Sequence, residues 1–356
     1  MKKNLFCLIF LLLNHTLNAQ FADLIKDKKV AWVGTSSIDV RLDMLHDKAL
    51  DDAREKIKYV LEGLDILKLE TGNNGEIEEG FSAFAHILLE AAKNKQIVAY
   101  SDSLCLHPID VINVITRLDT VYHCFAQTYE NPGYSILRNV LNAEDIKVFR
   151  AHQITTYSPK NGTWHSKTIS VAPLKIIQNE AGEFISLEPI FWMKVDNKKA
   201  NLNTSDITWA VRTRPRGREG LLDLNSVKIH KKTDANMPML HFLDLAKNDK
   251  NMRLYRVDIW RQKKILPIND LQTIFSSTDT ITDIDIITNK VKTRLAENKL
   301  DVNDINELRF VQEWAWDNKR KALSVRLLGI APMKKFKNEE GEFLFMIPLF
   351  YQRFDD

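Results

Sequence analysis

Two groupings of cysteine and histidine lie within about twenty positions of each other and contain the residue types that bind zinc. Cys105 and His107 form the first grouping, and His123 and Cys124 form the second. Thiolate and imidazole are common zinc ligands. On a strand, however, the adjacent residues His123 and Cys124 point to opposite faces, so they cannot both bind one ion. The sequence therefore favours no metal site. Cys105 and Cys124 are either two buried thiols or, in an oxidising compartment, a disulfide.

Residues that could perform hydrolysis lack the surroundings that such chemistry requires. The segment 34–37, Gly-Thr-Ser-Ser, belongs to no G-x-S-x-G elbow, the strained turn that exposes a nucleophilic serine in many hydrolases. The carboxylate pairs Glu180 with Glu183 and Glu339 with Glu342 fall in polar turns, where no desolvation tunes them for general acid–base catalysis. No phosphate-binding glycine loop is present among the 12 glycines. We therefore expect no catalytic residue, no cofactor and no enzymatic activity.

The densest charge in the chain is the segment RTRPRGREG, in which four arginines alternate with other residues. They are Arg212, Arg214, Arg216 and Arg218. Pro215 favours an extended backbone, and alternate residues of an extended chain share one face, so the four guanidinium groups would line up. Such a row can bind carboxylates or phosphates through paired hydrogen bonds. Two interpretations remain open: a solvated loop, or a candidate interface for an anionic partner surface or lipid headgroup.

The first residues have the pattern of an export signal. Lys2 and Lys3 precede the apolar run LFCLIFLLL and the small and polar residues NHTLNAQ, which predicts a signal peptide at 1–19 with cleavage after Ala19. Because Cys7 lies inside the apolar run, we expect no lipid-modified N-terminal cysteine. No later segment approaches the roughly 20 apolar residues of a membrane helix. Loss of the two lysines takes the net charge from +3 to +1, without the basic excess of a nucleic-acid-binding protein.

One sequence pattern occurs twice in the chain. The segment that begins at Ala172 matches the segment that begins at Ala331 without a gap, so the offset is 331 − 172 = 159. Each segment predicts a hairpin, with two strands around a polar turn that contains glycine. The match extends upstream, where 107–120 corresponds to 266–280, and it predicts an internal duplication. Among the positions that correspond to the Cys–His groupings, only Asp283 is a usual metal ligand. The glutamates that recur in both turns could reflect docking to a basic partner surface.

The spacing of apolar residues predicts helices before the strands. Amphipathic helices are expected at 50–64 and 81–91, where apolar residues recur at three- and four-residue steps. A short strand at 97–100, a third helix with Pro108 near its first turn, and a strand-rich stretch at 157–195 follow. Helices segregated from an antiparallel sheet are typical of the α+β class. We therefore expect an α+β fold, an internally duplicated module of helices plus antiparallel sheet.

A polar segment separates the two predicted modules. Residues 197–206, NKKANLNTSD, contain breakers and no apolar periodicity, which indicates a linker. The first α+β module is then expected at 20–196 and the second at 207–356. The second copy lacks an equivalent of the first predicted helix.

Each predicted hairpin is followed by two aromatic residues that are candidates for an interface. They are Phe191 and Trp192 in the first copy and Phe350 and Tyr351 in the second. Packing in the core is one interpretation. In the other, these rings fill pockets on neighbouring subunits, because aromatic anchors dominate the energies of interfaces.

The C-terminal part of the chain contains the sequences FVQEWAWDNKRKALSV, RLLGIAPMKKF and GEFLFMIPLFY. In these sequences the chain resembles the GldN/PorN family of gliding-motility and type IX secretion proteins. The matching positions are Trp314, Trp316, Asp317, Arg326, Gly329, Ile330, Ala331, Pro332, Pro348, Leu349 and Phe350. Tyr351 stands where the family usually has tryptophan, which the first copy keeps as Trp192, and Ser170 replaces Gly329 in that copy. The segments 31–44 and 84–101 resemble the family's N-terminal pattern more loosely.

The resemblance implies a structural role. It implies a periplasmic protein that assembles with copies of itself and with an outer-membrane lipoprotein into a large ring, without a cofactor and without catalysis. Such a protein would have no direct membrane span and would be associated with the outer membrane only through its partners. The alternative is a periplasmic ligand-binding or hydrolytic protein with a site between the two modules.

Overall fold

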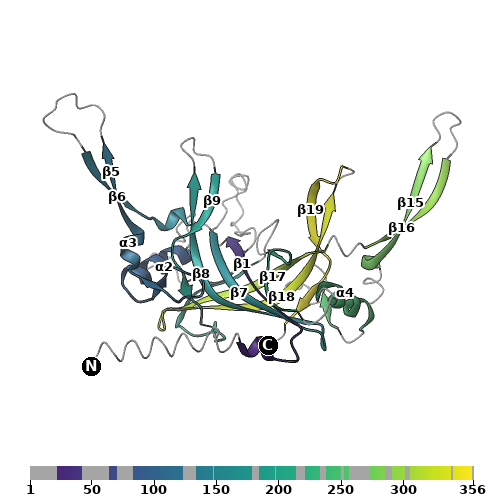
Figure 1. Cartoon of the computed structure of the whole chain (residues 1–356), viewed down its shortest axis with the longest axis horizontal. Coiled ribbons are helices and arrows are strands. Elements are labelled where there is room, and N and C mark those ends of the chain that lie inside the picture. The colour runs from purple at the N-terminus through teal and green to yellow at the C-terminus, as the bar shows by residue number, and fades with distance from the viewer. Residues whose placement is uncertain are drawn as a thin grey trace, which may run out of the picture.

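Two antiparallel β-sheets form the body of the molecule, and strand ribbons project from one side of it (Figure 1). The structure is a computed structural model that describes residues 22–41, 64–69, 83–122, 134–146, 148–178, 184–196, 198–213, 221–232, 238–249, 252–255, 273–284, 291–300, 305–337 and 340–354. The predicted signal peptide at 1–19 and most of the predicted helix at 50–64 lie outside these residues.

The first sheet has the strand order β10-β8-β7-β1-β13, and β9 pairs with β8 beyond this path. Its strands are β1 (Trp32–Arg41), β7 (Val148–Ser158), β8 (Thr163–Gln178), β9 (Phe184–Pro189), β10 (Met193–Lys194) and β13 (Lys228–Lys232). Strand β7 begins with alternating burial, and its residues 153–157 are all buried, because both of its faces are covered there.

The second sheet has the order β14-β20-β18-β17-β11-β2, while β12 pairs with β17 and β19 pairs with β18. Its strands are β2 (Leu64–Leu69), β11 (Ile207–Thr213), β12 (Leu221–Asp223), β14 (Leu254–Tyr255), β17 (Glu307–Asp317), β18 (Ala322–Lys337), β19 (Phe343–Pro348) and β20 (Tyr351–Arg353). The β7–β8 ladder shifts register at His152/Gln153, and the β17–β18 ladder shifts register at Val311/Gln312. The two shifts occur at corresponding positions, because they are separated by the same 159 residues as the two similar segments.

The remaining elements are small. Three further strand pairs are β3 (Ala99–Tyr100) with β4 (Pro108–Ile109), β5 (Thr116–Tyr122) with β6 (Tyr134–Val140), and β15 (Ser276–Ile284) with β16 (Val291–Lys299). The helices of the described residues include α2 (Ala83–Lys93), α3 (Val111–Ile115), the 3-10 turn η2 (Ala143–Asp145) and α4 (Pro238–Asn248). Short helical turns also occur at 22–26 and 273–275.

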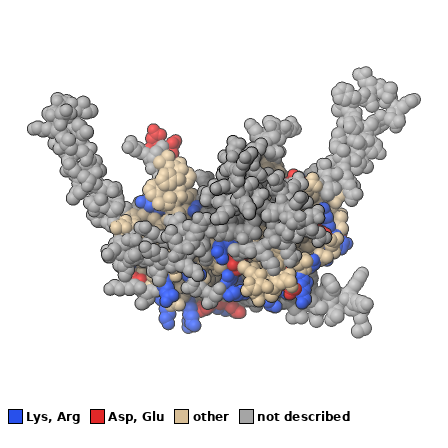
Figure 2. Space-filling model, turned by 180° about the vertical axis from the view of Figure 1, so that it is seen from behind, with Lys and Arg blue, Asp and Glu red and all other residues tan. Residues whose placement is uncertain are grey.

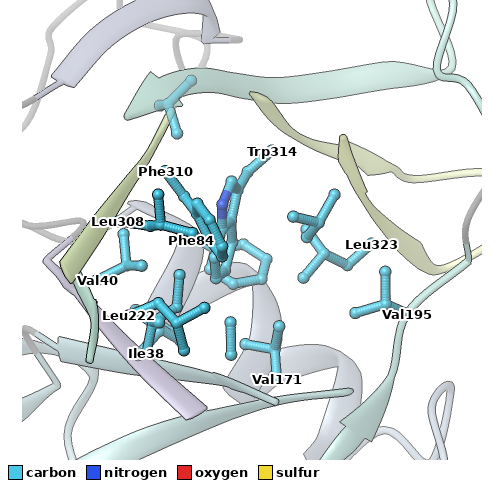
Figure 3. Close-up of a cluster of buried hydrophobic side chains, with 14 of the residues drawn as sticks. Ile38, Val40, Phe84, Val171, Val195, Leu222, Leu308, Phe310, Trp314 and Leu323 are labelled. Carbon is cyan, nitrogen blue, oxygen red and sulfur yellow. The ribbon is translucent and has the colours of Figure 1, made fainter. Parts of the chain in front are cut away.

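A core of large apolar side chains joins the two sheets and helix α2 (Figure 3). Phe84 of α2 lies at its centre, stacked on Trp209 of β11 with 4.6 Å between ring centroids. The rings of Phe149 from the first sheet and Trp314 from the second also contact Phe84. Each of these aromatic side chains removes a large apolar area from water, which holds the sheets and the helix together.

The expected fold class is wrong. The described residues are mostly in antiparallel strands, with few helices. They do not form an internally duplicated α+β module of helices plus antiparallel sheet. The apolar pattern after Pro108 gives only five helical residues, because the β-branched and aromatic residues that follow continue as β5. The helix predicted at 81–91 is confirmed as α2, and the predicted hairpins are confirmed as β8–β9 and β18–β19.

The two sheets exchange strands. Strand β13, from the C-terminal half of the chain, pairs with β1, whereas β2, from the N-terminal half, pairs with β11. Residues 198–206 form turns between β10 and β11. The division into modules at this segment stays a prediction.

Candidate interaction surfaces

Four hairpin ribbons rise on the same side of the molecule (Figure 1). The β5–β6 and β15–β16 ribbons stand at the two ends, and two shorter ribbons stand between them. We call the shorter ribbons the β9 arm (174–178 with 184–189) and the β19 arm (333–337 with 343–348). The turn of the β19 arm contains Gly341 with φ of 84°, the positive value for which the sequence predicted a glycine. The two arms are therefore hairpins with the same strand lengths and the same spacing in the chain.

The β19 arm presents apolar side chains to solvent. Phe345 and Ile347 share one face of its outer strand and are 51% and 42% exposed, and Phe343 and Leu344, beside the register shift at Phe336/Lys337, are 40% and 56% exposed. Glu340 and Glu342 are exposed at the turn. Figure 2 shows this arm as an uncharged shaft with acidic atoms at its tip. An exposed apolar strand edge of this kind is typical of a binding surface.

Basic side chains gather on the side of the molecule opposite to the arms (Figure 2). Several of them lie in the β7–β8 and β17–β18 turns or beside these turns. Exposed lysines there include Lys28, Lys29, Lys160, Lys199 and Lys319. The described tip of the β19 arm is therefore acidic, whereas the opposite side carries exposed lysines among acidic residues such as Asp27.

Only one arginine of the predicted row lies among the described residues. Arg212 is in β11, half-buried, and its Nη2 atom lies 3.9 Å from Oε2 of Glu313 in β17. Arg326 of β18 donates a hydrogen bond of 3.0 Å to the other oxygen of Glu313. The carboxylate of Glu313 is therefore held between two guanidinium groups within the sheet. Arg214, Arg216 and Arg218 lie outside the described residues, so their role as an interface stays a prediction.

The four aromatic residues after the hairpins are all buried. Phe191 and Phe350 lie in the main core, and the ring of Phe350 packs against Phe242 of α4 at 5.7 Å. Trp192 exchanges two backbone hydrogen bonds of 2.8 Å with Tyr100. Tyr351 belongs to a small cluster that also contains Tyr255. In this structure these rings pack inside the molecule, which corresponds to the first of the two interpretations above, and an interface role stays a prediction.

The loop that contains Cys105 and His107 is organised by a carboxylate. Burial opposes ionisation of Asp102, but backbone N–H groups of His107, Leu106 and Leu104 and the ring of His107 lower its pKa below the ordinary value. Cys105 is buried, and burial raises its pKa to about 12. His123 and Cys124 lie outside the described residues, so the disulfide stays a prediction. Within the described residues no group of three ligand-type side chains could hold a metal ion.

One serine of the segment 34–37 meets a histidine. Ser37 Oγ lies 3.1 Å from Nδ1 of His152, opposite it on the neighbouring strand β7, and burial lowers the pKa of His152. A hydrolase triad also needs an acid that orients the imidazole, and the contacts of His152 in the described part of the chain include none. We therefore interpret the contact between Ser37 and His152 as a cross-strand hydrogen bond.

A cavity of about 360 Å³ lies between β1, β13, the start of α4 and the segment before β17. Its lining is Trp32, Leu224, Asn225, Ile229, Lys232, Pro238, Met239, Leu240, Ile305 and Asn306. Most of these side chains are apolar, and Lys232 contributes a positive charge. Its size falls within the roughly 300–1,000 Å³ of ligand pockets. It is large enough to accept apolar side chains.

Sequence reasoning missed two of these features. The cavity joins residues that are far apart in the chain, such as Trp32 and Ile305, so no local pattern could reveal it. The apolar side chains of the β19 arm had a local signal, because residues 343–347, FLFMI, form a continuous apolar run after a tight turn. A two-stranded hairpin cannot bury both faces of such a run by itself.

No helix among the residues that the structure describes is long and apolar enough to cross a membrane. A comparison with curated proteins gives no match. A comparison with protein families matches residues 58–216 and 226–356 to the family described as "Gliding motility associated protein GldN". These two segments cover most of the chain and include both arms and the C-terminal sequence that suggested the resemblance, whereas strands β1 and β12 lie outside them. The chain therefore belongs to the GldN family, the gliding-motility and type IX secretion proteins, and is a component of that multi-protein machinery rather than a member of a known enzyme family.

Proposed function

We propose that this protein is a structural periplasmic component of the type IX secretion and gliding-motility machine, and that it assembles with copies of itself and with an outer-membrane lipoprotein into a ring. Membership of the GldN family is the observation that carries the proposal. The signal-peptide pattern at 1–19 supports export, and association with the outer membrane would come through the partners.

The surface of the molecule supports a role in assembly. Four ribbons extend from one side, and the β19 arm carries an exposed apolar strand with an acidic tip. Monomeric proteins rarely leave such edges uncovered, because they invite pairing with other chains. The opposite side carries exposed lysines in its turns, which can pair with an acidic surface of a neighbour.

Affinity capture tests the proposal. The tagged full-length protein is expressed in its own host, captured from detergent-solubilised envelopes, identified with its partners by mass spectrometry and imaged by electron microscopy. We expect rings that contain a lipoprotein. A variant that lacks residues 1–19 is the matched control, because it should stay in the cytoplasm and capture no envelope protein. A lone monomer in the periplasmic fraction would contradict the proposal.

The cavity beside β13 favours one alternative, a periplasmic ligand-binding protein. Trp32 comes from the first predicted module and Met239 from the second, so the cavity lies between the two halves of the chain. The same capture experiment separates the alternatives. A monomer that purifies with a small molecule, detected by mass spectrometry under native conditions, would favour ligand binding over assembly.

A further inference from the structure

The β19 arm has an apolar face that its own fold does not require. The ring of Phe345 stacks on that of Phe336 in β18, with 4.7 Å between centroids and an interplanar angle of 18°. The Nζ atom of Lys334 lies 4.8 Å from the centre of the Phe336 ring. These contacts fix the rings on one face of a two-stranded ribbon, where Ile347 extends the apolar surface, and Phe343 is also exposed near the turn. The face is therefore organised and still open to solvent.

The β9 arm provides an internal comparison. Ser186 lies opposite Ile177 in that arm, where Phe345 lies opposite Phe336 in the other. Glu188 lies opposite Lys175, a charged pair, where Ile347 lies opposite Lys334. The same hairpin geometry thus forms with a serine and a glutamate at these two positions. Phe345 and Ile347 are consequently not needed to form the arm, and their exposure calls for a partner. Phe343 and Leu344 have apolar counterparts in Phe184 and Ile185, which are 64% and 59% exposed, so Phe345 and Ile347 are what distinguishes the β19 arm.

The cavity beside β13 has the complementary properties. Its lining is mostly apolar, and two of the side chains that line it, Ile229 and Leu240, are themselves 48% and 43% exposed. Its opening therefore combines these apolar side chains with the exposed polar residues Asn225 and Lys232. A side chain that entered here would contact the indole of Trp32 and the thioether of Met239.

Charges and strand edges match between the two surfaces. Lys232 lines the cavity, and Lys228 is exposed on the same strand, whereas Glu340 and Glu342 are exposed beside the apolar face of the arm. In the described part of the chain, β13 pairs only with β1 and β19 pairs only with β18, so each has one open edge. Lysines on an edge strand discourage pairing with arbitrary strands. An arm with an acidic tip is instead attracted to these lysines, so they do not oppose its pairing with β13.

We propose that the apolar face of the β19 arm of one copy inserts into the cavity beside β13 of the next copy, with Phe345 as the central anchor. This inference rests on the proposed function, because it names the contact by which copies join. The contact uses different surfaces on the two molecules, so it is head-to-tail, and repeated contacts of this kind form closed rings or open filaments. Each subunit of a ring, and each subunit of a filament except the two at its ends, then uses both its β19 arm and its cavity.

Photocrosslinking in the assembled complex tests the contact. Two differently tagged copies are expressed in the native host, one with the photoreactive p-benzoylphenylalanine in place of Phe345. After irradiation, we expect a product that carries both tags, with the crosslink mapped by mass spectrometry to peptides within 224–240 or 305–306 of the other copy. The matched control places the same residue at Ser186, the corresponding position of the β9 arm, and should give no such product.

Substitutions supply the second measurement. Phe345→Ser combined with Ile347→Glu gives the β19 arm the residues that the β9 arm already carries, so the hairpin should still fold. Ile229→Glu places a carboxylate at the mouth of the cavity, where it repels the acidic arm tip. Each change should reduce the yield of captured assemblies at least about tenfold, as expected for loss of a central anchor. Phe184→Ser in the β9 arm is the control and should change the yield less than about twofold.

The outcomes separate this inference from the proposed function. Crosslinks from position 345 to another arm or to another protein overturn the inference while assemblies are still captured. Assemblies that survive both the arm and the cavity substitutions overturn it as well. If the unmodified protein is captured alone, the proposed function fails and the inference fails with it.

Discussion

The side chains of Gln153 and Gln312, which are separated by 159 residues, form a hydrogen bond with each other inside the molecule. Gln312 Nε2 donates to Gln153 Oε1 at 3.3 Å, and Gln312 Oε1 accepts from Trp314 Nε1 at 3.1 Å. The separation equals the offset between the two similar sequence segments, so corresponding positions of the two sheets meet. Both side chains are fully or almost fully buried. A polar link thus joins the two sheets within apolar surroundings.

Replacing Gln312 by leucine should destabilise the protein. The substitution leaves the Gln153 carbonyl and the Trp314 indole N–H without their partner, and a buried polar group without a hydrogen bond costs about 1–3 kcal/mol. Urea unfolding at pH 7 measures the change in the free energy of unfolding. Gln153→Leu together with Gln312→Leu should cost less than the sum of the two single changes. Strict additivity would show that the two amides are not coupled.

Loss of the Asp317 carboxylate should weaken the β17–β18 turn in a pH-dependent way. Burial opposes ionisation, but the backbone N–H and guanidinium of Arg320, at 2.8 and 2.5 Å, lower the pKa of Asp317. A lowered pKa means that this stabilisation is complete above about pH 4, the ordinary value for the unfolded chain, and is lost as the pH falls through the folded value.

We therefore expect Asp317→Asn to lower the free energy of unfolding by about 1 kcal/mol at pH 7. The difference from the unmodified protein should shrink below about pH 4. Asp206→Asn is the control, because its contact with Lys319 is long and exposed, and it should cost less than about 0.5 kcal/mol. A difference that stayed constant down to pH 2 would argue against the ionic contribution. The measurement is urea unfolding across this pH range.

The thiol of Cys105 should resist alkylation in the folded protein. Because burial raises its pKa to about 12, only about one molecule in 10⁴ carries the reactive thiolate at pH 8. Peptide mass spectrometry after iodoacetamide treatment should find Cys105 unmodified in native protein and modified after unfolding in urea and a reductant. Rapid labelling of the native protein would show that this loop opens.

Substitution of Gly34 should disturb the attachment of β13. A Cβ atom at this position would lie 2.3 Å from Val227 Cγ1 and 2.6 Å from the Trp32 ring, at the point where the β1–β13 register shifts. Gly34→Ala should therefore cost about 1–3 kcal/mol of stability. Limited proteolysis should cut it faster near 228–232 than the control Ser37→Ala. Equal cleavage rates would mean that the neighbouring side chains move aside.

The arginine row should divide into residues with two different roles. Arg214 and Arg216 lie outside the described residues, and replacing both by serine should weaken capture of the outer-membrane partner, with a larger effect at low salt than at high salt. Arg212→Ser should instead lower stability, because Glu313 loses one of its two guanidinium neighbours. An affinity that is unchanged by the double substitution, at either salt concentration, would remove the anionic-partner hypothesis.

The local features of the fold were largely predictable from the sequence. The amphipathic spacing around Phe84 and Leu88 gives helix α2, and the glycine-containing turn after Lys337 gives the β18–β19 hairpin. These elements are determined by residues that are close in the chain. The helix expected after Pro108 ends after one turn because β-branched residues follow it, and propensity competes there with strand pairing.

The arrangement of the sheets was not predictable in the same way. Nothing in the KIHKK sequence of β13 indicates that it pairs with β1, almost 200 residues earlier. Three of its five residues are lysines, so the strand has too little hydrophobic alternation to define its partner or its register. The predicted interface aromatics, such as Phe350, were ambiguous for a related reason. An apolar residue at the end of a hairpin fits a core and an interface equally well, and only the three-dimensional packing shows that it is buried.

The exchange of β2 and β13 between the sheets also sets an order of events during biosynthesis. Strand β1 ends at Arg41, but its second neighbour begins only at Lys228, about 190 residues later. At roughly 5–20 residues per second, a ribosome needs on the order of 10–40 seconds to make that stretch. Until then one edge of β1 remains unpaired, and the first sheet is incomplete. Such a chain completes its first sheet only late in synthesis, and until then the open edge of β1 can pair with other chains.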